Sequence, residues 1–231
     1  MTMLAGHYAT ALIANQKFPK KTLLFFLFAS QFQDFLWLTF HYLGLEPTGP
    51  HDVLDTTLTN LSVNMMYSHH ALPQLFWAAI IFLIGRLVFK SNVIGLVGLL
   101  LFASHFVLDF FSGHPHHVFG AQTHQVGLGL YASHAYLAVF IEFIFVVAAL
   151  WMFFRMEKQS GIERDPKNKW TIIALFAIGV MFMLFIATIS MREWLSIPQF
   201  DLGFNTSVPT LILTYVAMTW ILLKLVPAKR S

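Results

Sequence analysis

Long apolar runs separated by short polar connections dominate this 231-residue chain. A helix needs about 20 apolar residues to cross the hydrocarbon core of a bilayer, and six runs are near or above that length. They are Thr22 to Leu43, Leu72 to Phe89, Val93 to Phe111, Leu128 to Phe154, Trp170 to Ser190 and Ser207 to Val226, the last of which is weaker at its start. The pattern predicts an all-α polytopic helical membrane protein with about six transmembrane helices.

A shorter apolar stretch, Met3 to Ala14, precedes the first long run and predicts a re-entrant or tilted N-terminal helix. No basic residues precede it, so we expect no cleaved signal peptide. The sequence contains no internal repeat and no stretch typical of a soluble domain. We therefore treat residues 1–231 as one integral membrane domain. Residues 1–150 carry the candidate site, and residues 151–231 supply a cytoplasmic loop and two further spans.

The basic residues cluster in alternate connections between the apolar runs. The connections Gly44 to Ala71 and Ser112 to Gly127 contain no Lys or Arg, and Met191 to Thr206 contains only Arg192. Because basic loops stay on the cytoplasmic side, we expect a bacterial inner-membrane protein whose basic loops and C-terminus are cytoplasmic. The residues in question are Lys17, Lys20, Lys21, Arg86, Lys90, Arg155, Lys158, Arg164, Lys167, Lys169, Lys224, Lys229 and Arg230.

Composition supports this interpretation and narrows the chemistry. Hydrophobic residues make up 57% of the chain and charged residues 11%, against about 25% charged in a soluble domain. The basic residues report topology, so we expect no nucleic-acid partner. The chain has no cysteine, which excludes disulfides and thiolate metal sites.

Several ionisable residues interrupt the apolar runs, where each needs a partner, a water-filled cavity or a metal ion. Counted from the basic connections at about 1.5 Å per residue, they fall in one layer in the outer half of the membrane. Histidines and carboxylates together are the ligand set of zinc and similar divalent ions. The residues are His7, Asp34, His105, Asp109 and Glu142, with His69 and His70 at the head of the second run.

Each of these residues has a structural alternative to a metal-site role. His105 and Asp109 are four residues apart on one helical face and can meet one metal, or they can form a hydrogen bond that joins two helices. Asp34 is a candidate ligand or general base, or else a structural carboxylate bonded to Gln31. His7 is a candidate ligand or a packing histidine.

The remaining candidates are less specific. One of His69 and His70 could bind metal, or both could form a polar helix start. Glu142 could be a ligand, a proton shuttle or a hydrogen-bond acceptor for a ligand histidine, and His134 could line the same cavity. A histidine-rich outer loop could recruit metal, contact substrate or be solvated; it contains His114, His116, His117 and His124.

Five segments occur in an order that resembles one family. They are Gly6-His7-Tyr8-Ala9, the segment from Gln31 to Trp37, Tyr67-Ser68-His69, the segment from Ser104 to Phe110, and the segment from Val126 to Leu130. Over about the first 150 residues the chain resembles the predicted membrane-bound metal-dependent hydrolases of the YdjM-like group. The resemblance implies metal-site roles for His7, Asp34, His69, His105 and Asp109, with Glu142 nearby.

The chain departs from this family pattern at two places. Members often have Pro-Asp-x-Asp where Gln33-Asp34-Phe35-Leu36 stands, so a second carboxylate is missing. They often have Ser where this chain has His70. The order of the motifs is also loosely similar to that of the zinc-dependent phospholipases C and the fungal single-strand nucleases.

The leading hypothesis is a divalent-metal-dependent hydrolase that holds one or two ions, Zn²⁺ by preference, and uses Asp34 or Glu142 as general base. A site that opens at the outer leaflet favours a lipid or lipid-linked ester or phosphoester. The lack of a nearby Arg or Lys disfavours a phosphoester unless two metals bind it.

Two hypotheses from other classes stay open. A proton or metal-ion transporter would also use intramembrane His, Asp and Glu residues, although the confinement of the polar layer to one half of the membrane argues against it. A haem-binding membrane subunit would pair histidines such as His105 and His134. The carboxylate of Asp109 close to His105 argues against haem.

Overall fold

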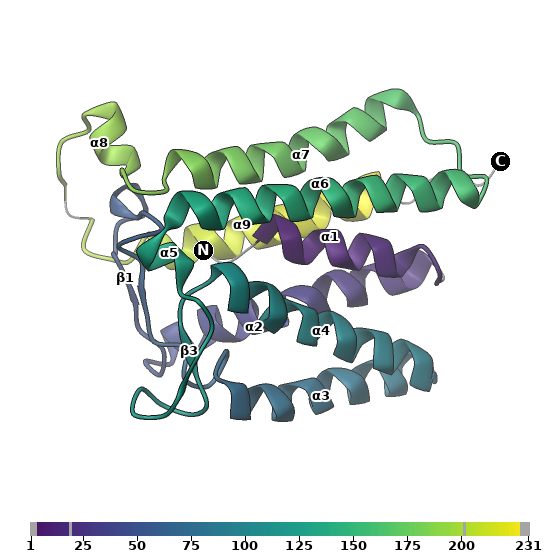
Figure 1. Ribbon diagram of the computed structural model, residues 1–231, viewed down its shortest axis with the longest axis horizontal. Helices are drawn as coiled ribbons and strands as arrows, with labels where there is room; N and C mark the ends of the chain where they lie inside the picture. Colours follow the sequence, from purple (N-terminus) through teal and green to yellow (C-terminus); the bar gives the residue numbers. More distant parts are fainter. Residues whose placement is uncertain (1–3, 19, 201, 227–231) are drawn as a thin grey trace.

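The computed structural model describes residues 4–18, 20–200 and 202–226, and six of its helices are long and apolar enough to cross a membrane. These six helices lie side by side in one bundle (Figure 1), which confirms the all-α polytopic prediction. The predicted start at Met3 and the basic residues Lys229 and Arg230 lie outside the described residues. The helices are α2 (Leu23–Tyr42), α3 (Ala71–Phe89), α4 (Asn92–Ser112), α6 (Ala135–Gln159), α7 (Pro166–Phe185) and α9 (Ser207–Leu225).

The connections alternate between the two ends of the bundle, as the distribution of Lys and Arg predicted (Figure 1). We call one end the basic end; it carries residues 16–18, 20–22, 90–91 and 160–165 and includes the 3-10 helix η1 (Lys20–Thr22). We call the other end the hairpin end; it carries residues 43–70, 113–134, 186–200 and 202–206.

The hairpin end contains short elements that hydropathy did not predict. Two antiparallel pairs of strands form there, β1 (Thr48–Gly49) with β2 (Ser62–Val63) and β3 (His116–His117) with β4 (Gln125–Val126). In register, Thr48 faces Val63 and His116 faces Val126. The 3-10 helix η2 (Val53–Asp55) and the helices α5 (Leu130–Ser133) and α8 (Met191–Leu195) complete this end.

An ion-pair cluster holds two of these connections together. Arg192, the single Lys or Arg of its connection, pairs with Asp52, which caps η2, and with Asp55, the last residue of η2. It also donates to the Pro198 carbonyl oxygen. This pairing fixes α8 against the connection between α2 and α3. The lone basic residue at the hairpin end is thus neutralised by acidic partners.

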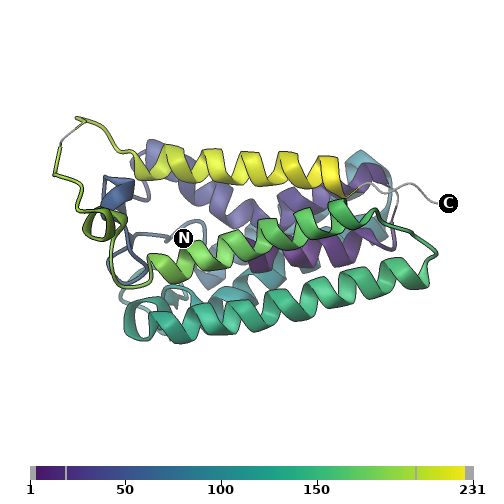
Figure 2. The ribbon, with the colours of Figure 1, turned by 90° about the horizontal axis from the view of Figure 1, so that it is seen from above.

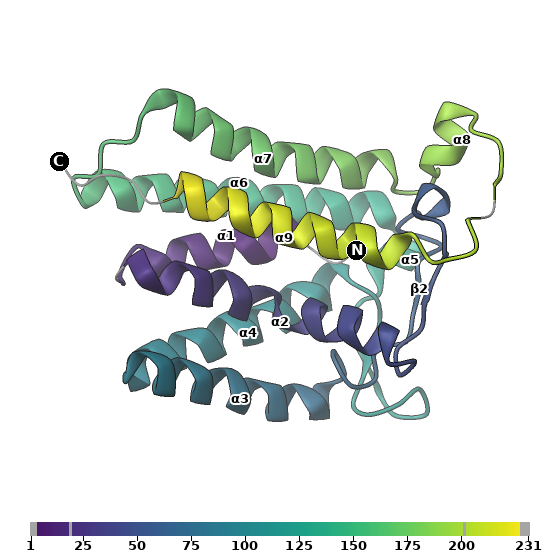
Figure 3. The ribbon, with the colours of Figure 1, turned by 180° about the vertical axis from the view of Figure 1, so that it is seen from behind.

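Helix α1 (Leu4–Asn15) lies in the middle of the bundle, where it contacts α2, α4, α6 and α7 (Figures 2 and 3). Its 12 residues extend about 18 Å, against a hydrocarbon core of about 30 Å. It begins inside the bundle and ends at the basic end (Figure 1). Ala5, Tyr8 and Ala9 are fully buried, and the small residues let neighbouring helices approach closely.

Two predicted span boundaries differ from the structure. The fourth run, predicted as Leu128 to Phe154, is broken at His134 (φ −146°, ψ 60°), and the long helix then continues to Gln159. The added turns end in straight-chain residues, which favour helix. The fifth run ends at Phe185 because Ser190 instead caps α8 in a reciprocal hydrogen-bond pair with Glu193.

The outer surface of the bundle is apolar. Leu75 and Leu87 of α3 are each 71% exposed, Ile178 of α7 is 68% exposed and Leu213 of α9 is 68% exposed. Large exposed apolar surfaces are avoided by soluble monomers but suit contact with lipid chains. The six helices and this surface together indicate an integral membrane protein.

Helices α3 and α4 pack at unusually close range through glycines. A Cβ atom built on Gly85 would lie 2.8 Å from the Gly95 Cα and 2.7 Å from the Phe25 ring, and one on Gly98 would lie 2.5 Å from the same ring. Phe25 of α2 therefore fills the space that the missing side chains of Gly85 and Gly98 leave. This contact sets the position of α4, which carries His105 and Asp109.

We predict that Gly85→Ala destabilises the protein by about 1–3 kcal/mol, because the added methyl group overpacks the contact between α3 and α4. Thermal unfolding in detergent would measure the effect. Gly179→Ala is the matched control, since its Cβ would meet Ala5 at an ordinary 3.8 Å. Equal stability of Gly85→Ala and wild type would contradict the proposed packing.

Candidate metal centre

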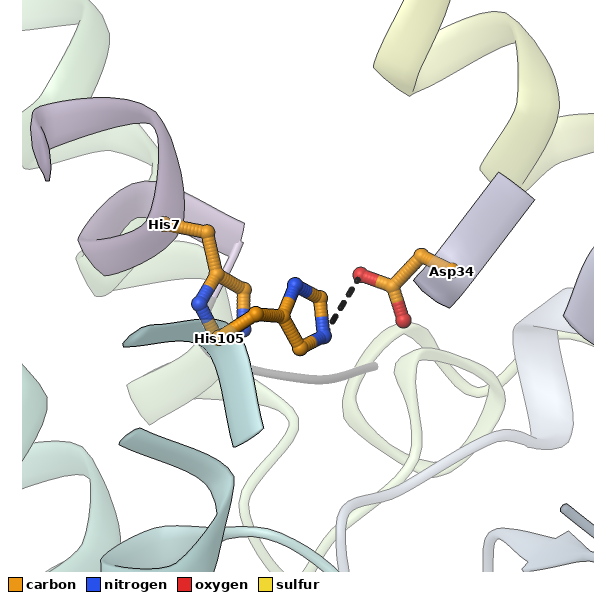
Figure 4. A group of neighbouring side chains, drawn as sticks. All are labelled: His7, Asp34 and His105. Atoms are coloured by element: carbon orange, nitrogen blue, oxygen red, sulfur yellow. Dashed lines mark ion pairs between the residues drawn. The ribbon is translucent and has the colours of Figure 1, made fainter. Parts of the chain in front are cut away.

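Five of the predicted site residues meet at one point inside the bundle, close to the start of α1. His7 comes from α1, Asp34 from α2, His69 from the segment before α3, and His105 and Asp109 from α4. All five side chains are completely buried. Figure 4 shows three of them, with the His7 and His105 rings stacked and Asp34 facing the His105 ring.

The donor atoms face one another at distances that suit a shared ion. His7 Nε2 lies 3.2 Å from Asp109 Oδ1, and His105 Nε2 lies 3.4 Å from Asp109 Oδ2 and 3.8 Å from Asp34 Oδ2. His69 Nε2 lies 3.4 Å from Asp34 Oδ1 and 3.9 Å from Asp109 Oδ2. Two donors bound to one zinc ion at a tetrahedral angle would be about 3.3–3.4 Å apart.

The group contains two overlapping sets of three donors, each within 4.8 Å of one another. One set is His7, Asp34 and His105, and the other is His69, His105 and Asp109. The arrangement could hold a metal ion, and His105 belongs to both sets.

The hydrogen bonding of His105 fixes its tautomer. Its Nδ1 lies 2.7 Å from the Ser30 carbonyl oxygen, which can only accept, so Nδ1 carries a proton. In the neutral ring Nε2 is then a bare lone pair, and it faces the oxygens of Asp34 and Asp109. A lone pair facing carboxylates is repulsive unless a cation lies between them, either a proton or a metal ion.

The remaining contacts are compatible with a metal ion and disfavour protonation of both stacked rings at once. His7 Nε2, His69 Nε2, His105 Nε2 and both oxygens of Asp109 form no hydrogen bond with any described residue, despite their proximity. The His7 and His105 rings stack with centroids 3.5 Å apart and an interplanar angle of 7°. Two imidazolium cations at that separation would repel each other.

The charge balance leads to the same conclusion. Within the described part of the chain, the ion pairs of Asp34 and Asp109 involve histidines and no Lys or Arg. Two buried carboxylates without a fixed cation would be strongly unfavourable. One divalent ion would neutralise both.

Two supporting residues were not identified from the sequence. The Tyr215 hydroxyl of α9 donates to Asp34 Oδ2 at 2.7 Å. Glu46 is fully buried, and its Oε1 accepts from the backbone N–H groups of Tyr67 (2.6 Å) and Ser68 (2.9 Å), the two residues before His69. Such outer contacts orient metal ligands. In the sequence, Glu46 is distinguished only as an acidic residue in a connection rich in Thr and Asn.

Glu142 lies beside the group but outside the two donor sets. Its Oε1 accepts from the Gly6 backbone N–H at 3.4 Å, one residue before His7, and its buried Oε2 has no hydrogen-bond partner among the described residues. Glu142 therefore stabilises the N-terminal turn of α1. Its predicted catalytic role stays a prediction.

The loop histidines separate into buried and exposed members. His116 is 1% exposed, and its ring stacks on His69 with centroids 5.6 Å apart. His114 is also buried, whereas His124 and His134 are exposed and outside the five-residue group. Burial lowers the pKa of His114 and of His116 to about 3, so both are neutral at neutral pH.

His70 and His117 form part of the loop framework instead. His70 Nδ1 accepts from the Gly120 backbone N–H at 2.9 Å, and His117 Nδ1 donates to the Thr123 carbonyl oxygen at 3.0 Å. Of the neighbouring pair His69 and His70, the structure thus brings His69 to the metal group and uses His70 to hold the β3–β4 loop.

Comparisons with protein-family models, curated proteins and solved structures found no match.

We predict that Tyr215→Phe weakens metal binding about 10–100-fold, because Asp34 loses the hydroxyl that orients it. Competition with a chromogenic zinc chelator would measure the affinity. Tyr136→Phe is the control, since the Tyr136 hydroxyl bonds Thr188 at an exposed position. Unchanged affinity in Tyr215→Phe would show that Asp34 is not a ligand or needs no orientation.

Proposed function

We propose that this protein is a membrane-embedded, divalent-metal-dependent hydrolase whose metal is held by His7, Asp34, His69, His105 and Asp109. The observation that carries the proposal is the His105 Nε2 lone pair, fixed by the Ser30 carbonyl and directed at two carboxylates. A resident cation explains that arrangement.

Zinc is the ion that suits these donors best. Three imidazole nitrogens with two carboxylates form a mixed nitrogen and oxygen set, which suits Zn²⁺, with Mn²⁺ and Fe²⁺ as other ions that accept it. The two oxygens of Asp109 face different histidines, Oδ1 toward His7 and Oδ2 toward His69 and His105. That arrangement would serve one ion or let Asp109 bridge two.

Hydrolysis is the reaction that this group supports best. When bound, such a metal lowers the pKa of a water ligand to about 7 and polarises a carbonyl or phosphoryl oxygen. Asp34 and Glu142 are the candidate proton acceptors. One Glu142 oxygen accepts from the backbone N–H of Gly6, the residue before the proposed ligand His7. The other oxygen forms no hydrogen bond with the described residues.

A lipid or lipid-linked substrate is supported by a cavity of about 570 Å³ between α1, α4 and α6. Most of its wall is apolar, with Val97, Leu100 and Met152 among the lining residues. It reaches Ser104, the residue before His105, and Thr10, whose hydroxyl donates to the His7 carbonyl oxygen at 2.7 Å. An acyl chain in this cavity would end beside the metal group.

We infer from the distribution of Lys and Arg that the basic end faces the cytoplasm, and that the membrane is a bacterial inner membrane. The ordered motifs of the sequence support membership in the YdjM-like group of predicted hydrolases. Four of the five motif segments contain the five proposed ligands: His7, Asp34, His69, and the pair His105 and Asp109.

A transporter explains the geometry less well. An ion path needs polar contacts on both sides of the buried group, but the cavity toward the basic end is lined mainly by apolar side chains. A haem subunit is also less suitable, because two carboxylates lie within 3.8 Å of His105 Nε2 and His134 is exposed.

We predict different outcomes for the two candidate bases. Glu142→Gln should retain metal and lose hydrolysis of lipid esters by about 10²–10⁴-fold, since it removes a proton acceptor. Asp34→Asn should lose both metal and activity. Elemental analysis together with a lipid-ester assay in mixed micelles would measure the two properties.

Glu163→Gln is the control, because Glu163 is exposed in the connection between α6 and α7. Full activity of Glu142→Gln would remove Glu142 from the mechanism. Activity that survives complete removal of metal from the wild-type protein would overturn the proposed function.

A further inference from the structure

The hairpin end contains a second cavity, of about 490 Å³, on the opposite side of the metal group from the apolar cavity. We call it the hairpin-end pocket. Its walls come from the segment before α3, from the β3–β4 loop and from α5, and they include Asn64, Met65, His70, His114, His117 and Ala132.

His116 lies between this pocket and the metal group. Residues 114, 115 and 117 line the pocket, whereas the ring of His116 stacks on His69 with an interplanar angle of 11°. This division follows from the strand geometry of β3, where successive side chains point to opposite faces. His116 is thus a direct contact between the pocket wall and a ligand residue.

Two histidines here have polar atoms that need a partner. Both ring nitrogens of His116 and the Nε2 of His114 are buried, and none has a hydrogen-bond partner among the described residues. The two side chains are 1% and 8% exposed. A buried polar group without a partner is costly. His114 lines the pocket, whereas the His116 ring lies against His69, so it is the His114 Nε2 that points to a ligand or water supplied from the pocket.

The lining chemistry selects an uncharged ligand. Among the described residues that line the pocket, none is Lys, Arg, Asp or Glu, and Met65, Met66 and Leu61 add apolar surface. A phosphate group is usually bound by Arg, Lys or a cluster of backbone N–H groups. A carbonyl group flanked by apolar atoms needs only neutral donors such as imidazole N–H.

We propose that the hairpin-end pocket binds the polar part of the substrate as an uncharged carboxylic ester or amide, with His114 as its hydrogen-bonding contact. This inference rests on the proposed hydrolase function and names its substrate class. The water oxygen would bond to the acyl carbon, the acyl C–O or C–N bond would break, and the proton lost by water would end on the leaving alcohol or amine.

The test uses full-length protein loaded with Co²⁺, whose visible absorption reports binding to the metal without requiring turnover. The probes are an alkyl hydroxamic acid, uncharged at neutral pH, and an alkylphosphonic acid of the same chain length. We expect the hydroxamic acid to bind at least about tenfold more tightly. His114→Phe should weaken its binding about three- to tenfold, the effect of one hydrogen bond.

His114→Phe keeps a ring beside Tyr131 and removes the two nitrogens, so a loss of binding would not simply reflect a cavity. His124→Ala is the control, because His124 is exposed in the same loop outside the pocket lining. Tighter binding of the phosphonic acid, or unchanged hydroxamate binding in His114→Phe, would overturn the inference.

A blocking experiment tests the pocket itself. The chain has no cysteine, so Ala132→Cys introduces a single thiol at the pocket wall that N-ethylmaleimide can modify. Modification should abolish hydroxamate binding while the Co²⁺ absorption persists, and modification of Ser160→Cys at the basic end should have no effect. Unaltered binding after modification of Ala132→Cys would overturn the pocket assignment.

Elemental analysis of the same samples distinguishes failure of the proposed hydrolase function from failure of the pocket inference alone. A wild-type protein that binds no metal contradicts the proposed function. A protein that binds metal and hydroxamate, with neither changed by the pocket variants, contradicts the inference alone.

Discussion

The confinement of two carboxylates and three histidines in a fully buried group, with no Lys or Arg among their described ion-pair partners, is the constraint on which the rest of the structure depends. Asp34 and Asp109 are fully buried, and the described chain offers them histidines as ion-pair partners. Because His105 directs a lone pair at both, a divalent ion held by the group would remove the repulsion between them. That cation would join α1, α2 and α4 and the segment before α3 at a single point.

The surrounding helices and connections hold the five site residues in place. Helix α1 is short enough to begin inside the bundle and brings His7 to the group, and Glu142 of α6 bonds the first turn of α1. Tyr215 of α9 bonds Asp34, and Glu46 fixes the backbone before His69. The tight glycine contact between α3 and α4 sets the height of His105 and Asp109. The helices that enclose the site therefore also orient its residues.

Much of this arrangement could be predicted from the sequence because two physical constraints are strong. Lipid requires long apolar helices, which fixes the six spans, and an ionisable residue in such a helix requires a partner, which singles out His7, Asp34, His105 and Asp109. Counting depth from the basic connections was enough to place these residues in one layer. The sequence does not show which of His69 and His70 belongs to the metal group. That distinction depends on the contact of His70 with the β3–β4 loop, which only the fold reveals.

The supporting residues could not be predicted in the same way. Tyr215 lies in an apolar run, where a tyrosine is ordinarily core or interface material, and nothing local shows that its hydroxyl reaches Asp34. Glu46 and His116 lie in connections whose course depends on short strands that hydropathy does not detect. The break at His134 was missed because the flanking residues are apolar on both sides.

Elemental analysis of the purified protein tests the central claim most directly, with wild type compared with His105→Ala and with His134→Ala as the control at an exposed histidine. The account predicts one or two equivalents of a divalent metal in wild type and in His134→Ala, and loss of that metal in His105→Ala. A wild-type protein that holds no metal, even after reconstitution with Zn²⁺, would contradict it.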